Sequence, residues 1–365
     1  AAGGTGGHIN PALAVAGEIR KRYPKANILF IGTAEKMEAR LVPAAGFDFK
    51  TIQISGFNRE LNLNGIKQNI KTLSYLLKSS SQAKKIIKDF NADAVIGFGG
   101  YVSGPVVRAA AKLGIPTAVH EQNAFPGMTN KTLAKMVDAV MLTEESVAQY
   151  MQPKNPPVVT GLPVRGELLE TDRDVARAEL GLDDKPFILS MGGSLGAKAI
   201  NDSMLEVIAN RTQKNDCVFM HATGKDCKDF PERLAEKGIN LNSKNIIIRD
   251  YIDDMHRCLA AADLVICRAG ASSLCEFQVM GKPSILIPYP FATENHQYHN
   301  AKALADKGAA ILIEEKDLTP AVLMQHIDTL LESPGKLTQM AKSAKQMAVT
   351  DATARIVKVI EGIIK

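Results

Sequence analysis

The chain has 365 residues, which is about the length of two ordinary domains. Hydrophobic residues make up 45% and charged residues 23%, and no uncharged apolar run reaches ~18 residues, so the composition excludes a transmembrane helix and favours a globular protein. Residues 1–160 carry 19 Lys and Arg against 11 Asp and Glu, whereas residues 161–365 carry 25 against 28, so an anionic partner is expected at the first part.

The N-terminus has no initiator methionine, and nothing there resembles a cleavable signal with a charged start and an apolar core. We expect that most of the strand before Gly3 is missing from this sequence and that the protein is cytoplasmic. The five cysteines form no C-x-x-C pair, which favours reduced thiols in the core over zinc ligands or disulfides. They are Cys217, Cys227, Cys258, Cys267 and Cys275.

The segment GGTGGH at residues 3–8 stands at the start of an amphipathic helical segment. Backbone N–H groups at such a helix start can bind a phosphate, although tight turns also need glycine for packing alone. The helix dipole disfavours the protonated form of His8, so we expect a neutral histidine that can accept a proton. The alternative is that His8 only caps the helix.

Short Val, Ile and Leu runs that end near glycine alternate with helical segments along the whole chain. This pattern predicts buried parallel strands in βαβ units, and therefore two doubly wound α/β domains. The expected strands lie within residues 27–32, 92–100, 116–121, 139–143, 187–193, 217–224, 245–252, 263–270, 283–290 and 309–315.

An internal similarity supports two domains of one plan. The segment that starts at Asp93 aligns with the one that starts at Asp263, with a glycine 7 and a serine 10 positions after each aspartate. The glycine loops at residues 3–8 and 192–197 form a second pair. We expect two Rossmann-like domains facing each other across a cleft, unless the similarity is only that of any two βαβ units.

Four prolines and two glycines interrupt the periodicity within residues 153–167, which indicates a linker. The expected organisation is an N-terminal domain over residues 1–160 and a second domain over residues 161–340. A C-terminal helix over residues 341–365 is expected to cross back to the first domain.

The loops at 192–197 and 268–273 are further candidates for phosphate binding. No full G-x-G-x-x-G is present, so an NAD enzyme in which Glu35 holds a ribose remains only an alternative, and no Gly-Lys-Ser/Thr follows the loops, which excludes a P-loop. Glu276 lies one turn into the helix after the second loop, where a carboxylate can accept hydrogen bonds from both ribose hydroxyls. The alternative for Glu276 is an ordinary acidic residue in the first turn of a helix.

No Asp-x-Asp stands at a strand end to hold a divalent metal, because Asp172 and Asp174 are typical of the start of an exposed helix. A leaving diphosphate would then be stabilised by backbone amides and Arg165. We expect neither a metal nor a cofactor.

Seven segments together closely resemble the MurG family of glycosyltransferases over essentially the whole chain. They are GGTGGHINPALA, GFGGYVSGPVV, HEQNAFPGMTNK, GLPVR, MGGSLGA, CRAGASSLCE and ENHQYHNA. The resemblance implies a GT-B fold and inverting, metal-independent transfer of N-acetylglucosamine from its UDP carrier to the 4-hydroxyl of undecaprenyl-diphosphate-linked N-acetylmuramoyl-pentapeptide. That step converts lipid I to lipid II in peptidoglycan synthesis.

The resemblance also implies site residues, with His8 as the catalytic base. The acceptor side is expected to include Thr5, His8, Tyr101, Glu121 and Asn123. The donor side is expected to include Thr5, Gly6, Gly7, Asn123, Arg165, Gly193, Ser194, Ile252, Ala271, Ser272, Ser273, Glu276, His296 and Gln297.

A lipid-linked acceptor requires contact with a membrane, and one helical stripe is suited to it. Apolar Ile66, Ile70, Leu73 and Leu77 are spaced along a helix, with Lys67, Lys71 and Lys78 each one position after a member of that stripe. An apolar stripe beside a basic one favours an interfacial helix on anionic lipid, and the alternative is a core-facing helix with solvated lysines.

The expected location is peripheral, on the cytoplasmic face of the cell membrane. Expected partners are UDP-N-acetylglucosamine, lipid I, the anionic membrane surface and proteins of cell-wall or division complexes, without nucleic acid. Alternatives that stay open are a UDP-N-acetylglucosamine 2-epimerase, a glycosyltransferase with a diacylglycerol acceptor, a nicotinamide dehydrogenase and a non-catalytic nucleotide-binding module.

Overall fold

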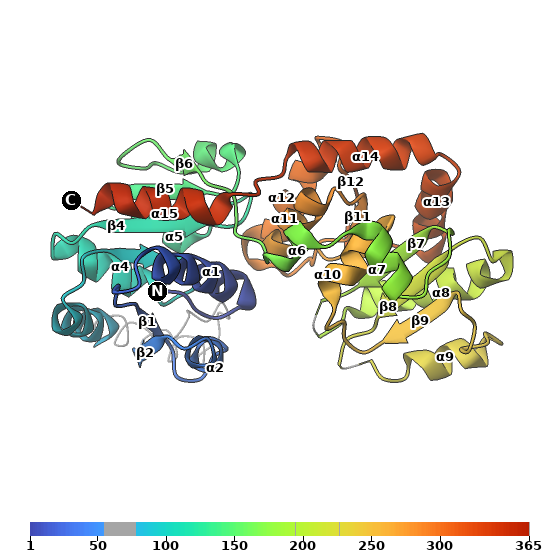
Figure 1. Cartoon of the computed structure of the whole chain (residues 1–365), viewed down its shortest axis with the longest axis horizontal. Helices are drawn as coiled ribbons and strands as arrows, with labels where there is room; N and C mark the ends of the chain where they lie inside the picture. The colour runs from blue at the N-terminus through green and yellow to red at the C-terminus, as the bar shows by residue number, and fades with distance from the viewer. Residues whose placement is uncertain (55–77, 194, 226, 365) are drawn as a thin grey trace. The chain divides into compact units, whose positions relative to one another are not determined.

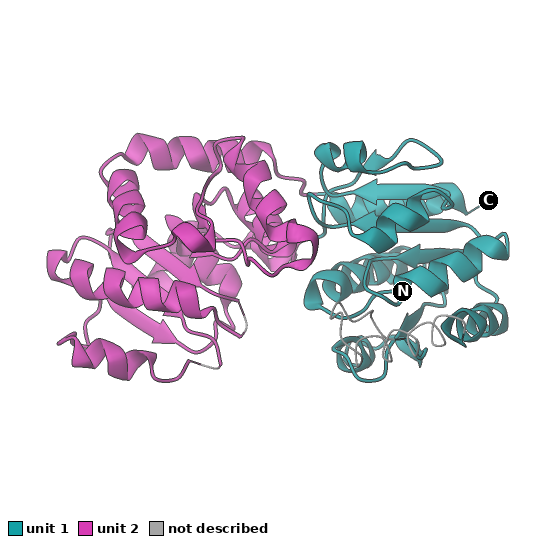
Figure 2. Ribbon diagram, turned by 180° about the vertical axis from the view of Figure 1, so that it is seen from behind, with its two compact units in different colours: residues 1–163, 351–365 teal, residues 164–350 magenta. Residues whose placement is uncertain are grey.

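The computed structural model describes residues 1–54, 78–193, 195–225 and 227–364. The chain forms two compact units (Figure 2), and each is described by itself. Unit 1 contains Ala1–Pro163 and Asp351–Lys365, and unit 2 contains Val164–Thr350. In the described residues, no helix is long and apolar enough to cross a membrane.

Unit 2 is built on a sheet of six strands in the order β12-β11-β10-β7-β8-β9, and every neighbouring pair is parallel. The strands are β7 Phe187–Met191, β8 Val218–Ala222, β9 Ile246–Arg249, β10 Leu264–Cys267, β11 Ser284–Leu286 and β12 Ala310–Leu312. The chain winds outward from β7 in one direction and returns to wind outward from β10 in the other. The order reverses between these two strands, which is where doubly wound folds bind ligands.

Consecutive residues of β7 show why helices cover both faces of this sheet. Phe187 and Leu189 belong to one buried cluster, whereas Ile188 between them belongs to another, because successive side chains of a strand point to opposite faces. The helices of unit 2 are α6 Glu167–Glu170, α7 Arg173–Glu179, α8 Lys198–Arg211, α9 Phe230–Glu236, α10 Met255–Ala261, α11 Ala271–Met280, α12 His296–Ala305, α13 Pro320–Leu331 and α14 Pro334–Gln346.

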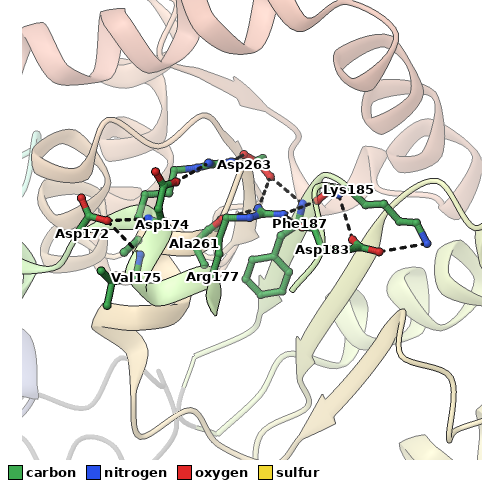
Figure 3. A network of polar contacts seen from close by, with 12 residues as sticks. Asp172, Asp174, Val175, Arg177, Asp183, Lys185, Phe187, Ala261 and Asp263 are labelled. Atoms are coloured by element: carbon green, nitrogen blue, oxygen red, sulfur yellow. Dashed lines mark hydrogen bonds and ion pairs between the residues drawn. The ribbon is translucent and has the colours of Figure 1, made fainter. Parts of the chain in front are cut away.

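A polar network fixes the amino edge of this sheet, away from the glycine loops (Figure 3). The carboxylate of Asp263 accepts hydrogen bonds from Arg177 at 3.1 Å, from Arg173 at 2.8 Å and from the Phe187 amide at 2.8 Å. Asp172 accepts from the amides of residues 174 and 175 and so caps α7. The prediction that Asp172 and Asp174 begin an exposed helix is therefore confirmed.

Unit 1 has a parallel four-stranded sheet in the order β3-β4-β5-β6 and a parallel pair, β1 and β2. The strands are β1 Leu29–Gly32, β2 Asp48–Thr51, β3 Val95–Gly97, β4 Thr117–Glu121, β5 Ala139–Leu142 and β6 Val158–Val159. The helices are α1 Gly6–Arg22, α2 Glu38–Ala44, residues 78–90, α4 Ser103–Lys112, α5 Met128–Ala134 and α15 Ala352–Ile363.

The first residues of the chain lie along β3. The N-terminal ammonium group of Ala1 donates to the Ile96 carbonyl at 2.6 Å, and the Phe98 amide donates to the Ala1 carbonyl at 2.8 Å. A cavity of about 270 Å³ is lined mainly by apolar residues, among them residues of α1, β1, β3 and α15. The chain passes from Ala1 into the glycine loop, so that this loop lies at the carboxyl end of β3.

The C-terminal segment differs from the prediction in where it starts. We expected residues 341–365 to form the returning helix, but α14 runs to Gln346 inside unit 2, and α15 belongs to unit 1. Buried Ile356, Val357 and Ile360 of α15 share a core with α1, which α15 contacts (Figure 1). The boundary is wrong because both segments have amphipathic helical patterns, and only packing partners separate them.

Each of the predicted strands is present, and the described part of the chain has two further short strands, β2 and β6, that were not predicted. Most residues of β2 and both residues of β6 are exposed, so neither has the apolar pattern of a buried strand. β6 lies within the predicted linker, and the boundary between the units falls after Pro163.

Candidate functional site

In unit 1, His8 lies in the first turn of α1, which has Thr5 as its N-cap. Its ring contacts the side chain of Gln122, which directly follows β4, with 3.0 Å between His8 Nδ1 and Gln122 Oε1. The ring therefore has a partner outside its own helix. It lies where the loop before α1 meets the loops that follow β3 and β4.

Glycines allow the loop after β3 to approach this histidine. Gly99 and Gly100 have φ of +96° and +79°, which side chains rarely allow. A Cβ on Gly99 would lie 2.6 Å from His8 Nδ1, and one on Gly100 would lie 2.3 Å from the Gly3 carbonyl oxygen. The contact between the two loops thus depends on glycine at both positions.

Glu38 holds the first glycine loop from the other side. Its buried carboxylate accepts hydrogen bonds from the Gly4 amide at 3.0 Å, and from the Thr33 amide at 3.0 Å and hydroxyl at 2.7 Å. Burial alone would raise the pKa of Glu38, but these hydrogen bonds lower it below its ordinary value. The Gly4 amide is therefore already bound to an anion of the protein, which the sequence pattern of a phosphate loop does not reveal.

Glu121 lies beneath the loop that follows β4, with only 2% of its surface exposed. It accepts hydrogen bonds from the Asn123 amide and side chain at 3.0 and 3.2 Å, from the Gly127 amide at 3.1 Å and from Asn130 at 2.7 Å. Burial raises the pKa of Glu121, and these donors oppose that shift. This burial favours a role of Glu121 in shaping the loop over direct contact with an acceptor substrate. Tyr101, in contrast, is exposed.

In unit 2, two glycine loops lie side by side at the carboxyl edge, because β7 and β10 are hydrogen-bonded neighbours. Gly196 packs so closely on residue 224 that a Cβ would lie 2.2 Å from the Thr223 carbonyl, whereas a Cβ on Gly193 would meet nothing within 4 Å. One glycine thus serves packing, and the other leaves open space. Ser194 lies outside the described residues.

The second loop leads into α11, whose N-cap is Gly270. Ala271, Ser272 and Ser273 form the first turn, which contains no acidic residue and is partly exposed. The unpaired amides of a helix start and the helix dipole favour an anion there. Together with the adjacent open glycine loop, this lets the carboxyl edge of unit 2 bind an anionic group such as a phosphate.

Arg165 and Glu276, 111 residues apart, form an ion pair with 2.9 Å between Nε and Oε1. The Glu276 side chain is 14% exposed, and burial raises its pKa, while Arg165 opposes that shift. The fold thus brings together the residues predicted to contact the ribose and the diphosphate.

Gln297 connects the ends of two strands, because its Oε1 accepts hydrogen bonds from the amides of Ala269 at 3.2 Å and Tyr289 at 3.0 Å. Its amide oxygen is thereby committed to the backbone. His296 beside it has Nδ1 2.7 Å from the Thr293 carbonyl, so Nδ1 carries a proton. Ile252, which follows β9, is buried.

Some predicted residues are not tested by these contacts. Ile66, Lys67, Ile70, Lys71, Leu73 and Leu77 lie outside the described residues, and Lys78, the first described residue after them, is helical and exposed. Sequence reasoning missed Glu38 and Gln122. The segment HEQN contained Gln122, but the hydrogen-bond partners of both side chains are visible only in the folded chain. Among the residues described, no group of three or more His, Cys, Asp or Glu side chains could hold a metal ion.

Comparisons with known proteins agree with this two-unit arrangement. Residues 1–142 match the Glycosyltransferase family 28 N-terminal domain, and residues 187–356 match the Glycosyltransferase family 28 C-terminal domain. A solved UDP-GlcNAc 2-epimerase from Neisseria meningitidis is similar with a TM-score of 0.66 but only 13% identity, covering 97% of each chain, which shows the fold alone.

Relatives with higher sequence identity show the family as well as the fold. The UDP-N-acetylglucosamine–N-acetylmuramyl-(pentapeptide) pyrophosphoryl-undecaprenol N-acetylglucosamine transferase of Acetivibrio thermocellus is 46% identical over 364 residues, 100% of this chain and 97% of that protein. The crystal structure of Acinetobacter baumannii MurG has a TM-score of 0.80 at 34% identity, covering 99% of this chain and 97% of that one. The two parallel-sheet units are those of a GT-B glycosyltransferase, and the chain belongs to the MurG family.

Proposed function

We propose that this protein transfers N-acetylglucosamine from UDP-N-acetylglucosamine to the 4-hydroxyl of undecaprenyl-diphosphate-linked N-acetylmuramoyl-pentapeptide. The acceptor oxygen forms a bond to the anomeric carbon with inversion, the bond from that carbon to the diphosphate breaks, and UDP leaves. Similarity over the whole chain to relatives named for this reaction supports the proposal. An epimerase of the same fold is not favoured, because that likeness rests on 13% identity.

The observation that carries the chemistry is His8 at the carboxyl end of β3, with Nδ1 committed to Gln122. The other ring nitrogen, Nε2, takes the proton of the attacking hydroxyl. A base of this kind contributes about 10²–10⁴-fold to a rate. Thr5, Gly6 and Gly7 border the same helix start, and Tyr101 and Asn123 come from the neighbouring loops.

Unit 2 binds the donor at its carboxyl edge. The amides of Gly193 and of Ala271 to Ser273 hold the diphosphate, and Arg165 adds a positive charge that stabilises the leaving group. Glu276 accepts hydrogen bonds from the ribose. Ser194, Ile252, His296 and Gln297 complete the donor site around the uracil and the sugar.

We also place the protein at the cytoplasmic face of the cell membrane, as a peripheral protein. The excess of Lys and Arg in residues 1–160 and the stripe at residues 66–78 support binding to anionic lipid. Proteins of cell-wall synthesis or division complexes are the expected protein partners.

The test is transfer of sugar from UDP-N-acetylglucosamine to a soluble lipid I analogue by the wild type, His8→Ala and His326→Ala. His326 in α13 of unit 2 receives the same substitution away from the glycine loops. We expect transfer by the wild type and by His326→Ala, and a loss of at least about a hundredfold in His8→Ala with UDP binding intact. An inactive wild type contradicts the reaction, and a fully active His8→Ala contradicts the base.

A further inference from the structure

The side-chain amide of Gln122 has one orientation that its surroundings allow. Its Nε2 lies 2.8 Å from the Phe98 carbonyl oxygen and 3.1 Å from the His120 carbonyl oxygen. Carbonyl oxygens only accept hydrogen bonds, so the NH₂ group must face them. The amide oxygen of Gln122 therefore faces His8.

This orientation determines where the proton of the His8 ring lies. Gln122 Oε1 can only accept, and it lies 3.0 Å from His8 Nδ1, so Nδ1 must donate. In a neutral imidazole the other nitrogen then carries the lone pair. The Nδ1–H tautomer is the one that leaves Nε2 able to take a proton from a hydroxyl group.

A second histidine fixes Gln122 from behind. His120 is fully buried, and its Nε2 lies 2.8 Å from the Gly161 carbonyl oxygen, so Nε2 donates. Burial lowers the pKa of His120 to about 4, so its ring is neutral and Nδ1 is an acceptor, 3.3 Å from Gln122 Nε2. The ring also stacks on Phe98, with 5.8 Å between centroids. The hydrogen bonds thus run in one direction from His8 through Gln122 and His120 to Gly161.

We propose that Gln122 is a positioning residue for the transfer reaction, which holds the His8 ring in the Nδ1–H tautomer and in a fixed orientation. The proposal rests on the proposed function, in which His8 is the base. Gln122 itself touches neither the reacting carbon nor the attacking oxygen. It acts because a base whose lone pair is on the wrong nitrogen cannot take the proton, however close it lies.

The first test compares Gln122→Met, which removes both hydrogen-bonding ends with little change of shape, with a matched control. The control is Thr117→Val, which removes a partly buried hydrogen bond to Asp138 at the opposite end of β4. We expect kcat of Gln122→Met to fall by more than about tenfold and by less than in His8→Ala, since His8 sets the upper limit. In Thr117→Val we expect kcat to stay unchanged.

Adding Gln122→Met to His8→Ala should cause no further loss of kcat, because the residue acts through the ring that is gone. A purely structural role would instead lower activity by the same factor in both backgrounds, and that result overturns the proposal. A kcat of Gln122→Met equal to the wild type overturns it as well.

The second test reads the tautomer directly, by ¹⁵N NMR of protein labelled at histidine, with the His8 signals identified by their loss in His8→Ala. We expect a protonated Nδ1 in the wild type and in Thr117→Val, and a mixture of tautomers in Gln122→Met. An unchanged tautomer in Gln122→Met overturns the proposal while the role of His8 stands. Full activity of His8→Ala instead overturns the base, and the positioning role falls with it.

Discussion

Replacement of Gly99 by alanine tests whether the close approach of the two loops positions the base. Gly99 has φ +96°, and a Cβ there would lie 2.6 Å from His8 Nδ1. The backbone cannot easily swing away, because Ser103 Oγ accepts from the Gly99 amide at 3.1 Å and donates to its carbonyl at 2.8 Å. The His8 ring must therefore move.

Gly114 provides a matched control in the same unit, because it has φ +73° but open space around its Cβ position. Alanine at either glycine costs about 1–2 kcal/mol of backbone strain. At Gly99, displacement of the ring also breaks the hydrogen bond from His8 to Gln122, which adds about 0.5–1.5 kcal/mol. The expected loss of stability is thus about 1.5–3.5 kcal/mol for Gly99→Ala against about 1–2 kcal/mol for Gly114→Ala.

The difference in activity should be larger than the difference in stability. We expect kcat of Gly99→Ala to approach that of His8→Ala, about a hundredfold or more below the wild type, and kcat of Gly114→Ala to stay near it. Urea unfolding followed by circular dichroism and the transfer assay measure the two effects. Equal stability and equal kcat in the two variants would refute the reasoning.

Three further predictions follow from the described contacts and from the sequence. The lowered pKa of Glu38 contributes stability that is fully present above the ordinary value of 4.5 and is lost as pH falls through the lower folded-state value. In Glu38→Gln, the free energy of unfolding in urea should therefore fall less steeply with decreasing pH than in the wild type. The same pH dependence in both proteins would contradict this prediction. Glu276→Gln should raise KM for UDP-N-acetylglucosamine roughly tenfold or more, because a hydrogen bond to a charged group contributes about 1.5–3 kcal/mol, whereas Glu332→Gln at the end of α13 should leave KM unchanged. Changing Lys67, Lys71 and Lys78 together to Glu should reduce the amount of protein that sediments with anionic vesicles, while affinity for UDP-N-acetylglucosamine stays the same. Undiminished sedimentation would contradict a role of these lysines in membrane binding.

The two similar α/β units were predictable because their strands are buried on both faces and therefore read as continuous apolar runs. The residues 187–191 and 264–267 are examples, and both form central strands. β2 and β6 were missed because they are short and exposed, so pairing rather than apolar character makes them strands. The start of α15 was misplaced because an amphipathic pattern does not say which core the helix will cover.

The candidate site shows the same division between local pattern and packing. His8 and the glycine loops could be picked out from residue type and position at a helix start. Glu121 could be picked out too, but its burial under four hydrogen-bond donors could not, because those donors come from the folded loop. Glu38 and Gln122 carry no local signal, since each acts on a glycine loop or a histidine far away in the sequence.

The sequence by itself therefore determined which chemical groups are available, namely the glycines, the histidine, and the acidic and basic side chains. It also determined the order along the chain of the strands that position these groups. Tertiary structure decided which of these groups meet, namely the carboxyl ends of β7 and β10, Arg165 with Glu276, and His8 with Gln122. The physical reason is that local sequence sets backbone conformation and apolar faces. The partner of a polar side chain is instead set by packing between segments that can lie more than a hundred residues apart in the chain.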